Sequence, residues 1–169
     1  MPDAPDPTQR TFVSYIDKSR EYYGAQGYGN PYQWARNPGA PFAQLAKPLA
    51  ESRIGIVTTA SIVEGEEEPE PFSVPLVVFS APTSPPPATL YTNHRSWDKE
   101  ATHTDDLGSF FPLQELANFA SEGRIGSVSP RFYGSPTQYS QRQTITADAP
   151  EIARLCRADG VDAVLLPAL

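Results

Sequence analysis

The chain has 169 residues, enough to bury the core of one domain without disulfides or metals. Its formal net charge is −7 and no cluster of basic residues stands out, so nucleic acid and anionic membrane surfaces are not expected partners. It contains one cysteine, Cys156, which excludes a disulfide framework, and no apolar run approaches the roughly 20 residues that span a bilayer, so we expect a soluble cytoplasmic protein.

The N-terminal region is expected to form a helix and an aromatic arm. Residues 1–10 are polar and rich in proline, which predicts a disordered lead-in, and residues 11–169 are assigned to a single α/β domain. Residues 12–23 place aromatic and apolar side chains on one face at helical spacing, which predicts an amphipathic helix. We expect residues 11–48, this helix and the arm that follows, to pack on the domain or on a partner subunit.

Three segments predict strands of a sheet. Residues 53–58 are rich in β-branched side chains, and the small residues that follow them form a candidate wall of a site. Residues 125–129 predict a short strand. Residues 161–166 are a nearly continuous apolar run, which is typical of a strand buried on both faces of a parallel sheet. Weaker strand patterns occur at residues 75–80 and 89–92.

Two predicted helices alternate with these strands. The first covers residues 112–122, and the second begins at Asp148 with the spacing of a capping box and ends before Gly160. This alternation predicts an α/β fold with three layers and a mostly parallel, Rossmann-like sheet. The 19 prolines predict long Pro-rich loops, among them residues 130–136.

The polar centre of the sequence is the loop predicted at residues 93–106, which contains both histidines. His94, His103, Asp105 and Asp106 combine imidazole and carboxylate groups that suit a divalent metal, but their spacing matches no tight metal-binding signature. The alternative is that the aspartates cap local backbone N–H groups and the histidines bind substrate.

Two arginines are candidate carboxylate clamps for an anionic substrate. They are Arg95 in this loop and Arg131 in the loop at residues 130–136, and surface ion pairs are the competing interpretation for both. We expect the candidate substrate-binding residues to border one cleft at the carboxyl ends of the strands: His94, Arg95, His103, Asp105, Asp106 and Arg131. Cys156 lies on the apolar stripe of the last helix, which predicts a core residue.

Several short motifs follow one another along the chain: FVSYIDKSREYY at residues 12–23, RIGIVTT at 53–59, HTDD at 103–106 with FPL at 111–113, EGRIGS at 122–127 and DGVDAVLL at 159–166. From about Phe12 to the end, their order and spacing resemble the selenoprotein B family of the glycine, sarcosine, betaine and D-proline reductases. The resemblance implies reductive cleavage of a carbon–nitrogen bond in a small amino acid or its N-methylated relative. It also implies a selenolate nucleophile and electrons from partner subunits.

The expected partners are therefore a small amino-acid-like or carboxylate substrate, and other reductase subunits or further copies in a homo-oligomer. In the family, a redox loop with selenocysteine or cysteine follows the strand that residues 161–166 resemble, and this chain contains no such residue there. We expect the catalytic residue just after Leu169, beyond an in-frame UGA read as stop; a short cysteine-free relative is the competing explanation.

No metal or other cofactor is expected in this chain itself, since the selenocysteine belongs to full-length relatives. Two other function classes stay open. One is a non-catalytic subunit or small-carboxylate-binding module. The other is a metal-dependent hydrolase that uses the loop at residues 94–106.

Overall fold

The computed structural model describes residues 15–29, 39, 43–62, 76–92, 104–137 and 140–167. The chain divides into two compact units, Met1–Pro41 and Phe42–Leu169, each of which is described by itself. Within the described ranges, no helix has the length and apolar character needed to cross a membrane.

The first unit contains one helix, α1 (Tyr15–Ala25), at the position predicted by the periodicity of residues 12–23. The chain turns at Gly27, which has the left-handed φ of 84° that glycine adopts without strain. Three tyrosine rings contact one another at the end of the helix. The ring of Tyr23 stands edge-on to the ring of Tyr22 on α1 and to the ring of Tyr28, which follows the helix. All three side chains are exposed.

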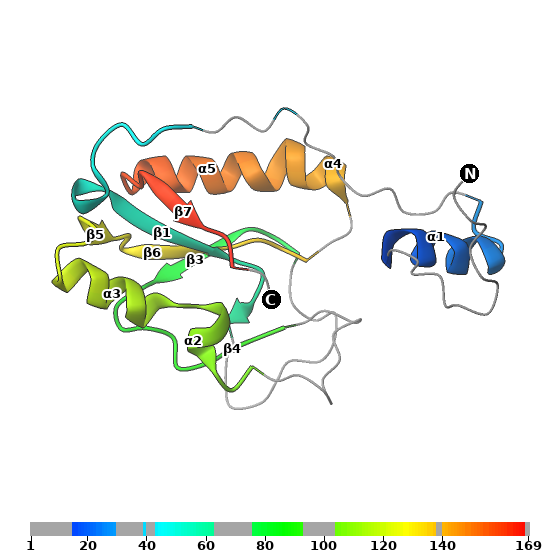
Figure 1. Ribbon diagram of the computed structural model, residues 1–169, viewed down its shortest axis with the longest axis horizontal. Helices are drawn as coiled ribbons and strands as arrows, with labels where there is room; N and C mark the ends of the chain where they lie inside the picture. The colour runs from blue at the N-terminus through cyan, green and yellow to red at the C-terminus, as the bar shows by residue number, and fades with distance from the viewer. Residues whose placement is uncertain are drawn as a thin grey trace, which may run out of the picture. The chain divides into compact units, whose positions relative to one another are not determined.

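The second unit is a mixed α/β fold with a mostly parallel, curled sheet (Figure 1). Strand β1 (Arg53–Thr58) is central. Strands β5 (Ser127–Val128) and β6 (Arg131–Gly134) follow one another along one of its edges, and β7 (Ala163–Leu165) lies along the other, all parallel to β1. Strand β3 (Phe79–Pro82) pairs antiparallel with β6, and β2 (Ser61–Ile62) pairs with β4 (Leu90–Tyr91) in a separate ribbon.

Strand β6 corrects the sequence prediction, which assigned residues 130–136 to a loop. Phe132 and Tyr133 are fully buried, Phe132 in the cluster that contains Ile54 and Ile56, Tyr133 in the cluster that contains Val57. A short segment buried on both faces lacks the alternation of polar and apolar residues that identifies a half-buried strand. The prolines at both ends of the segment favoured the loop prediction instead.

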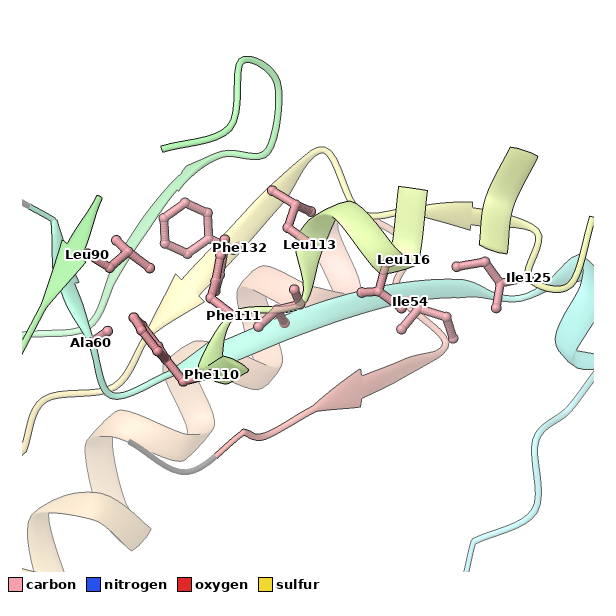
Figure 2. Packing of buried hydrophobic residues seen from close by; sticks show 10 residues of the cluster. Ile54, Ala60, Leu90, Phe110, Phe111, Leu113, Leu116, Ile125 and Phe132 are labelled. Atoms are coloured by element: carbon pink, nitrogen blue, oxygen red, sulfur yellow. The ribbon is translucent and has the colours of Figure 1, made fainter. Parts of the chain in front are cut away.

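One face of the sheet is covered by α2 (Leu107–Phe110) and α3 (Leu113–Ser121). Figure 2 shows side chains of α2, α3 and the turn between them against β1 and β6: the ring centroids of Phe111 and Phe132 are 4.8 Å apart, and Leu116 lies near Ile54. The predicted helix at residues 112–122 is confirmed as α3. This cluster is the larger of the two cores.

The opposite face is covered by α5 (Ala149–Ala158), whose Cys156 packs with Val57 and Tyr133. The start of α5 next to Asp148 agrees with the prediction, but Asp148 has helical backbone angles and makes no capping hydrogen bond, so the predicted capping box is not formed. The helix continues from α4 (Gln141–Gln143) through a π-helical turn, Thr144–Asp148, and Ser140 caps the start by accepting the N–H of Gln143. The wider turn lies just before Pro150, which has no N–H to donate to it.

The predicted end of α5 is confirmed. Gly160 has a φ of 64°, the Val161 N–H donates to the Cys156 carbonyl at 2.9 Å, and the Gly160 N–H donates to the Arg157 carbonyl at 3.1 Å. This pair of hydrogen bonds is the Schellman arrangement, which satisfies carbonyls left over at a helix end.

Connection handedness explains why α3 and α5 lie on opposite faces. The chain crosses from β1 to β5 and β6 on one side, and then from β6 back over β1 to β7 on the other. Parallel crossovers are almost always right-handed, so two crossovers in opposite directions must place their helices on opposite faces. Figure 1 shows this arrangement.

Strand β7 is confirmed in position but not in burial. It was expected to be buried on both faces, whereas Leu165 is 41% exposed and the following Leu166 is 71% exposed. The reason is topological: among the described residues β7 pairs with β1 alone, so it is an edge strand.

Candidate functional site

The carboxyl ends of β1 and β6 are the candidate site. They are neighbours in the sheet, with Thr58 opposite Gly134, and the N–H of Ser135 donates to the Thr58 carbonyl at 2.8 Å. The chain leaves β1 towards the α3 face and leaves β6 towards the α5 face. Adjacent strands whose connections diverge to opposite faces form a topological switch point, the place where open α/β sheets bind ligands.

A hollow of about 570 Å³ begins at this switch point and runs along α5 and β7; we call it the α5 hollow. Its wall at the switch point carries hydroxyl groups, and the remainder is mostly apolar. The hydroxyl residues are Thr58, Thr59, Ser135 and Thr144. The apolar lining comes from Val57, Ala149, Ile152, Ala153, Cys156, Val161, Ala163, Val164, Leu166 and Pro167, and Arg157 and Asp162 complete it.

The loop after β1 is held by its own threonine. The Thr58 side chain is buried, and its Oγ1 accepts the N–H of Ala60 at 3.1 Å, which fixes the turn. Thr59 between them is half-buried and lines the hollow. The prediction that this loop forms a wall at the carboxyl edge therefore agrees with its position.

The start of the α4–α5 helix lies at the same end of the sheet, because it directly follows β6. A helix N-terminus presents N–H groups and the positive end of the helix dipole. Thr144, in the π-helical turn, is among the residues that line the hollow. This end of the α5 hollow is thus lined by residues that carry hydroxyl groups and lies within about a turn of the helix start, which suits a small anionic or zwitterionic ligand.

The opposite, amino edge of the sheet contains a half-buried polar network around Asp159. Arg131 donates to Asp159 through Nε at 2.9 Å and Nη2 at 2.8 Å, and through Nη1 to the Ser80 hydroxyl at 3.2 Å. The Tyr133 hydroxyl donates to Asp159 Oδ2 at 2.7 Å and lies 3.0 Å from the Ser129 hydroxyl. The network ties the end of α5 to β6 and β3.

The pKa values in this network follow from those contacts. The hydrogen bonds from Arg131 hold the pKa of Asp159 below its usual value, and the same pairing raises the pKa of Arg131. Burial raises the pKa of Tyr133 well above its usual value. At neutral pH the network therefore contains a carboxylate, a guanidinium and a neutral phenol.

A second group of contacts fixes the start of β7. Asp162 accepts the backbone N–H of Arg53 at 2.7 Å and pairs with Lys47 at 2.8 Å, while Arg53 donates to the Asp159 carbonyl at 2.5 Å. The pairing with Lys47 lowers the pKa of Asp162. Both groups of contacts join the turn between α5 and β7 to the sheet, which is a structural role.

Arg131 was predicted to border a cleft at the carboxyl ends of the strands. It is the first residue of β6, so it lies at the amino edge, away from Thr59 and Ser135. Its guanidinium is engaged by Asp159 and Ser80, which disfavours its use as a substrate clamp. The error follows from taking β6 for a loop.

The other predicted site residues come from the loop at residues 93–106. His94, Arg95 and His103 lie outside the described residues. Asp105 and Asp106 are exposed and precede α2; the Asp106 carbonyl accepts the N–H of Ser109 at 3.1 Å, and its side chain makes no capping hydrogen bond. In the described part of the chain, no group of three or more His, Cys, Asp or Glu side chains is arranged to hold a metal ion.

Cys156 is a buried core residue, as predicted from its place on the apolar stripe. Burial raises the pKa of its thiol, although the neighbouring Tyr133 hydroxyl partly offsets this. A thiol of raised pKa is largely protonated at neutral pH, so it is a poor nucleophile.

Sequence reasoning missed Ser135 and Thr144 as lining residues of the hollow and Asp159 as the centre of the polar network. Ser135 directly follows β6, and because residues 130–136 were predicted as a loop, its place at the end of a strand was not recognised. Asp159 had no local signal, because its partners are 26 and 28 residues away along the chain. Comparison with known proteins found no relative: no family model, curated protein or solved structure matches this chain.

Proposed function

We propose that this chain is the substrate-binding part of a selenol- or thiol-dependent reductase that resembles selenoprotein B and cleaves the carbon–nitrogen bond of a small amino acid or its N-methylated relative. Three of the motifs that resemble this family lie in β1 or in strands that pair with β1. RIGIVTT is β1 with its loop, EGRIGS leads into β5, and DGVDAVLL ends in β7, so three motifs far apart in the sequence meet in adjacent strands.

The observation that carries the proposal is the topological switch point between β1 and β6. Such a point predicts the position of a ligand independently of any resemblance. A three-layered, Rossmann-like arrangement is part of the same proposal, since that architecture uses switch points for small ligands.

The chemistry of the α5 hollow fits a small zwitterion or betaine. Hydroxyl groups of Thr59, Ser135 and Thr144 offer donors for a carboxylate, and the helix that starts at this end favours negative charge. The apolar wall of Ala149 and Ile152 offers contact for methylene and N-methyl groups. We place the substrate carboxylate against the hydroxyl groups, with its amine towards the carboxyl end of β7.

The proposal assigns the nucleophile to the loop that follows β7 in the resembling family. Because β7 is parallel to β1, its carboxyl end points to the same edge as Thr59 and Ser135. A selenolate or low-pKa thiolate there would attack carbon, form a bond to it and displace the amine, which leaves with a proton. Two electrons from partner subunits and a proton would then cleave the new carbon–selenium or carbon–sulfur bond, release the deaminated carboxylate and restore the nucleophile. Cys156 is not this group, because its pKa is raised rather than lowered.

Binding tests the proposal directly. Isothermal titration with glycine, sarcosine, betaine and D-proline should detect binding of at least one of them. Choline, which lacks the carboxylate, should bind much more weakly. Ser135→Ala should weaken the binding about tenfold, the effect of losing roughly 1.4 kcal/mol from a charge-assisted hydrogen bond.

The matched control is Thr146→Val. Thr146 is an exposed hydroxyl residue of the π-helical turn that contains Thr144, and its hydroxyl donates to the Arg142 carbonyl rather than to the hollow. Its substitution should leave the affinity unchanged. Absence of binding for every ligand, or equal binding by wild type and Ser135→Ala, would refute the assignment of this site.

A non-catalytic carboxylate-binding module is the second candidate, favoured by the raised pKa of the one thiol in the sequence. It predicts the same binding and the same effect of Ser135→Ala. The two candidates differ in turnover: a chain that carries a selenocysteine- or cysteine-containing loop after β7 should release amine when electron-donating subunits are added if it is the reductase, and should not if it is the module.

A further inference from the structure

The α5 hollow is much larger than the head group that the proposed reductase would bind. Its volume is about 570 Å³. If each non-hydrogen atom is given the roughly 30 Å³ that a water molecule occupies in the liquid, glycine fills about 150 Å³. A carboxylate, an amine and the carbon that joins them therefore occupy only one end of the hollow, and the larger part remains for another group of the ligand.

The part of the hollow that remains is lined by apolar residues on one face of α5. Ala149, Ile152, Ala153 and Cys156 follow one another at the spacing of successive helical turns, and Val164 of β7 belongs to the same lining. At a rise of about 1.5 Å per residue, the wall from Ala149 to Cys156 is about 10 Å long. It offers space for an extended chain of several carbon atoms, and not only for a methyl group.

This wall is only partly covered in the described part of the chain. Ile152, Ala153 and Val164 are half-buried, and Leu166, which also lines the hollow, is 71% exposed. Covering apolar surface that water still reaches is favourable. A ligand therefore gains affinity by placing an apolar group against this wall.

Polar groups lie at the two ends of the hollow rather than along this wall. One end carries the hydroxyl residues of the switch point. At the other end, Asp162 already accepts the N–H of Arg53 at 2.7 Å and pairs with Lys47 at 2.8 Å, and Arg157 is exposed to solvent. A ligand group between the two ends meets only apolar lining, so an aliphatic group fits there better than a polar group, which would lose its water without gaining a partner.

We propose that the substrate of this site is an amino acid, or its N-methylated relative, with an aliphatic side chain that extends along α5. This inference rests on the proposed function, because the carboxylate stays against the hydroxyl groups at the switch point. It adds the substituent on the carbon next to the carboxylate, which lies against Ile152 and Val164 and reaches towards Cys156. Glycine is then the shortest member of a series whose longer members bind more tightly.

Ala153 is the residue that sets the space for this side chain. It lies in the middle of the wall, between Ala149 and Cys156 along α5, and its small side chain leaves room in the hollow. A leucine would fill part of that room, and because leucine is a strong helix former like alanine, Ala153→Leu should keep α5 intact. The matched control is Ala158→Leu, the same substitution at an exposed position of α5 outside the lining of the hollow.

Isothermal titration with glycine and with racemic alanine, norvaline and norleucine tests the proposal. The affinity should rise about fourfold for each added methylene group from alanine to norleucine, the effect of burying that group on an apolar wall. Racemic 2,4-diaminobutyrate has the shape of norvaline but ends in an ammonium group, so it should bind no more tightly than alanine. Ala153→Leu should cancel most of the gain between alanine and norleucine, whereas Ala158→Leu should keep it.

The outcomes separate this inference from the function on which it rests. Equal affinities from alanine to norleucine in the wild type would overturn the inference and leave the proposed function in place. A gain that Ala153→Leu preserves in full would also contradict it, because the side chain would then lie elsewhere. Absence of binding for glycine and for every longer member would refute the proposed function and this inference together. The wild-type series gives a decision even if Ala153→Leu does not fold.

Discussion

Arg131 and Asp159 form a bidentate ion pair that joins the first residue of β6 to the residue that ends α5, with Nε to Oδ2 at 2.9 Å and Nη2 to Oδ1 at 2.8 Å. The Asp159 side chain is 12% exposed and that of Arg131 is 35% exposed. This half-buried geometry makes the pair more stabilising than the exposed pair of Glu151 and Arg154 on α5.

Asp159→Asn should lower the free energy of unfolding by about 1–2 kcal/mol, because it removes a charged acceptor of two hydrogen bonds from Arg131 and one from Tyr133. Urea unfolding at pH 7 measures the change. Glu151→Gln is the control, since it removes an exposed pair on the same helix and should leave the urea midpoint unchanged. Equal effects of the two substitutions would contradict the structural role of Asp159.

The same pair predicts a dependence of stability on pH. The folded protein holds the pKa of Asp159 below its ordinary value of 3.8, so the folded state binds this proton less readily than the unfolded state. The stabilisation is therefore present above that ordinary value and is lost as the pH falls through the lower, folded pKa. Below pH 4, wild type should lose stability more steeply than Asp159→Asn, as measured by urea midpoints. Parallel pH curves for the two proteins would argue against the pairing.

Gly134→Ala should destabilise the protein by about 1–3 kcal/mol, the usual cost of forcing an extra group into a packed core. A Cβ at Gly134 would overlap the ring of Phe79, the residue opposite it on β3. The double variant Gly134→Ala with Phe79→Leu should recover part of the loss relative to the sum of the single changes, in a thermal or urea double-mutant cycle. Strict additivity would place the cause elsewhere.

The Cys156 thiol should react slowly in the folded protein. Burial both raises its pKa and limits access, so the rate with Ellman's reagent at pH 7 should be far below that of the urea-unfolded chain. The folded rate should increase as the pH rises towards the raised pKa. Rapid reaction at neutral pH would mean an accessible thiolate, and Cys156 would become a candidate nucleophile.

Ile56→Ala should cost about 2–5 kcal/mol of unfolding free energy, the range for removing a large aliphatic side chain from a core. Ile56 is almost fully buried in the cluster between β1 and α3. Leu76→Ala removes a similar side chain from an exposed position and should change the stability by less than about 0.5 kcal/mol. Chemical denaturation of both variants makes the comparison.

Part of the fold was predictable because its signals are local. The β-branched run of β1, the amphipathic pattern of α3 and the glycine that ends α5 each act within a few residues, and all three were found as expected. β6 was missed because Phe132 and Tyr133 are buried on opposite faces, which leaves no alternation to read. The helical turns before α5 were missed because Asp148 and Pro150 mark an interruption inside a longer helix rather than its capped beginning.

The candidate site was predictable only in outline. Thr59 was expected at the carboxyl edge because it follows a predicted strand, whereas Arg131 was assigned to that edge through the missed strand and lies at the other. The sequence by itself determined the strand β1, the two covering helices and the core position of Cys156, since periodicity and caps depend on neighbouring residues. Only the tertiary structure decided that β1 lies between β6 and β7, that their connections diverge to opposite faces, and that Asp159 meets Arg131 and Tyr133. Those relationships depend on the order of strands and the handedness of crossovers, which join residues far apart in the chain.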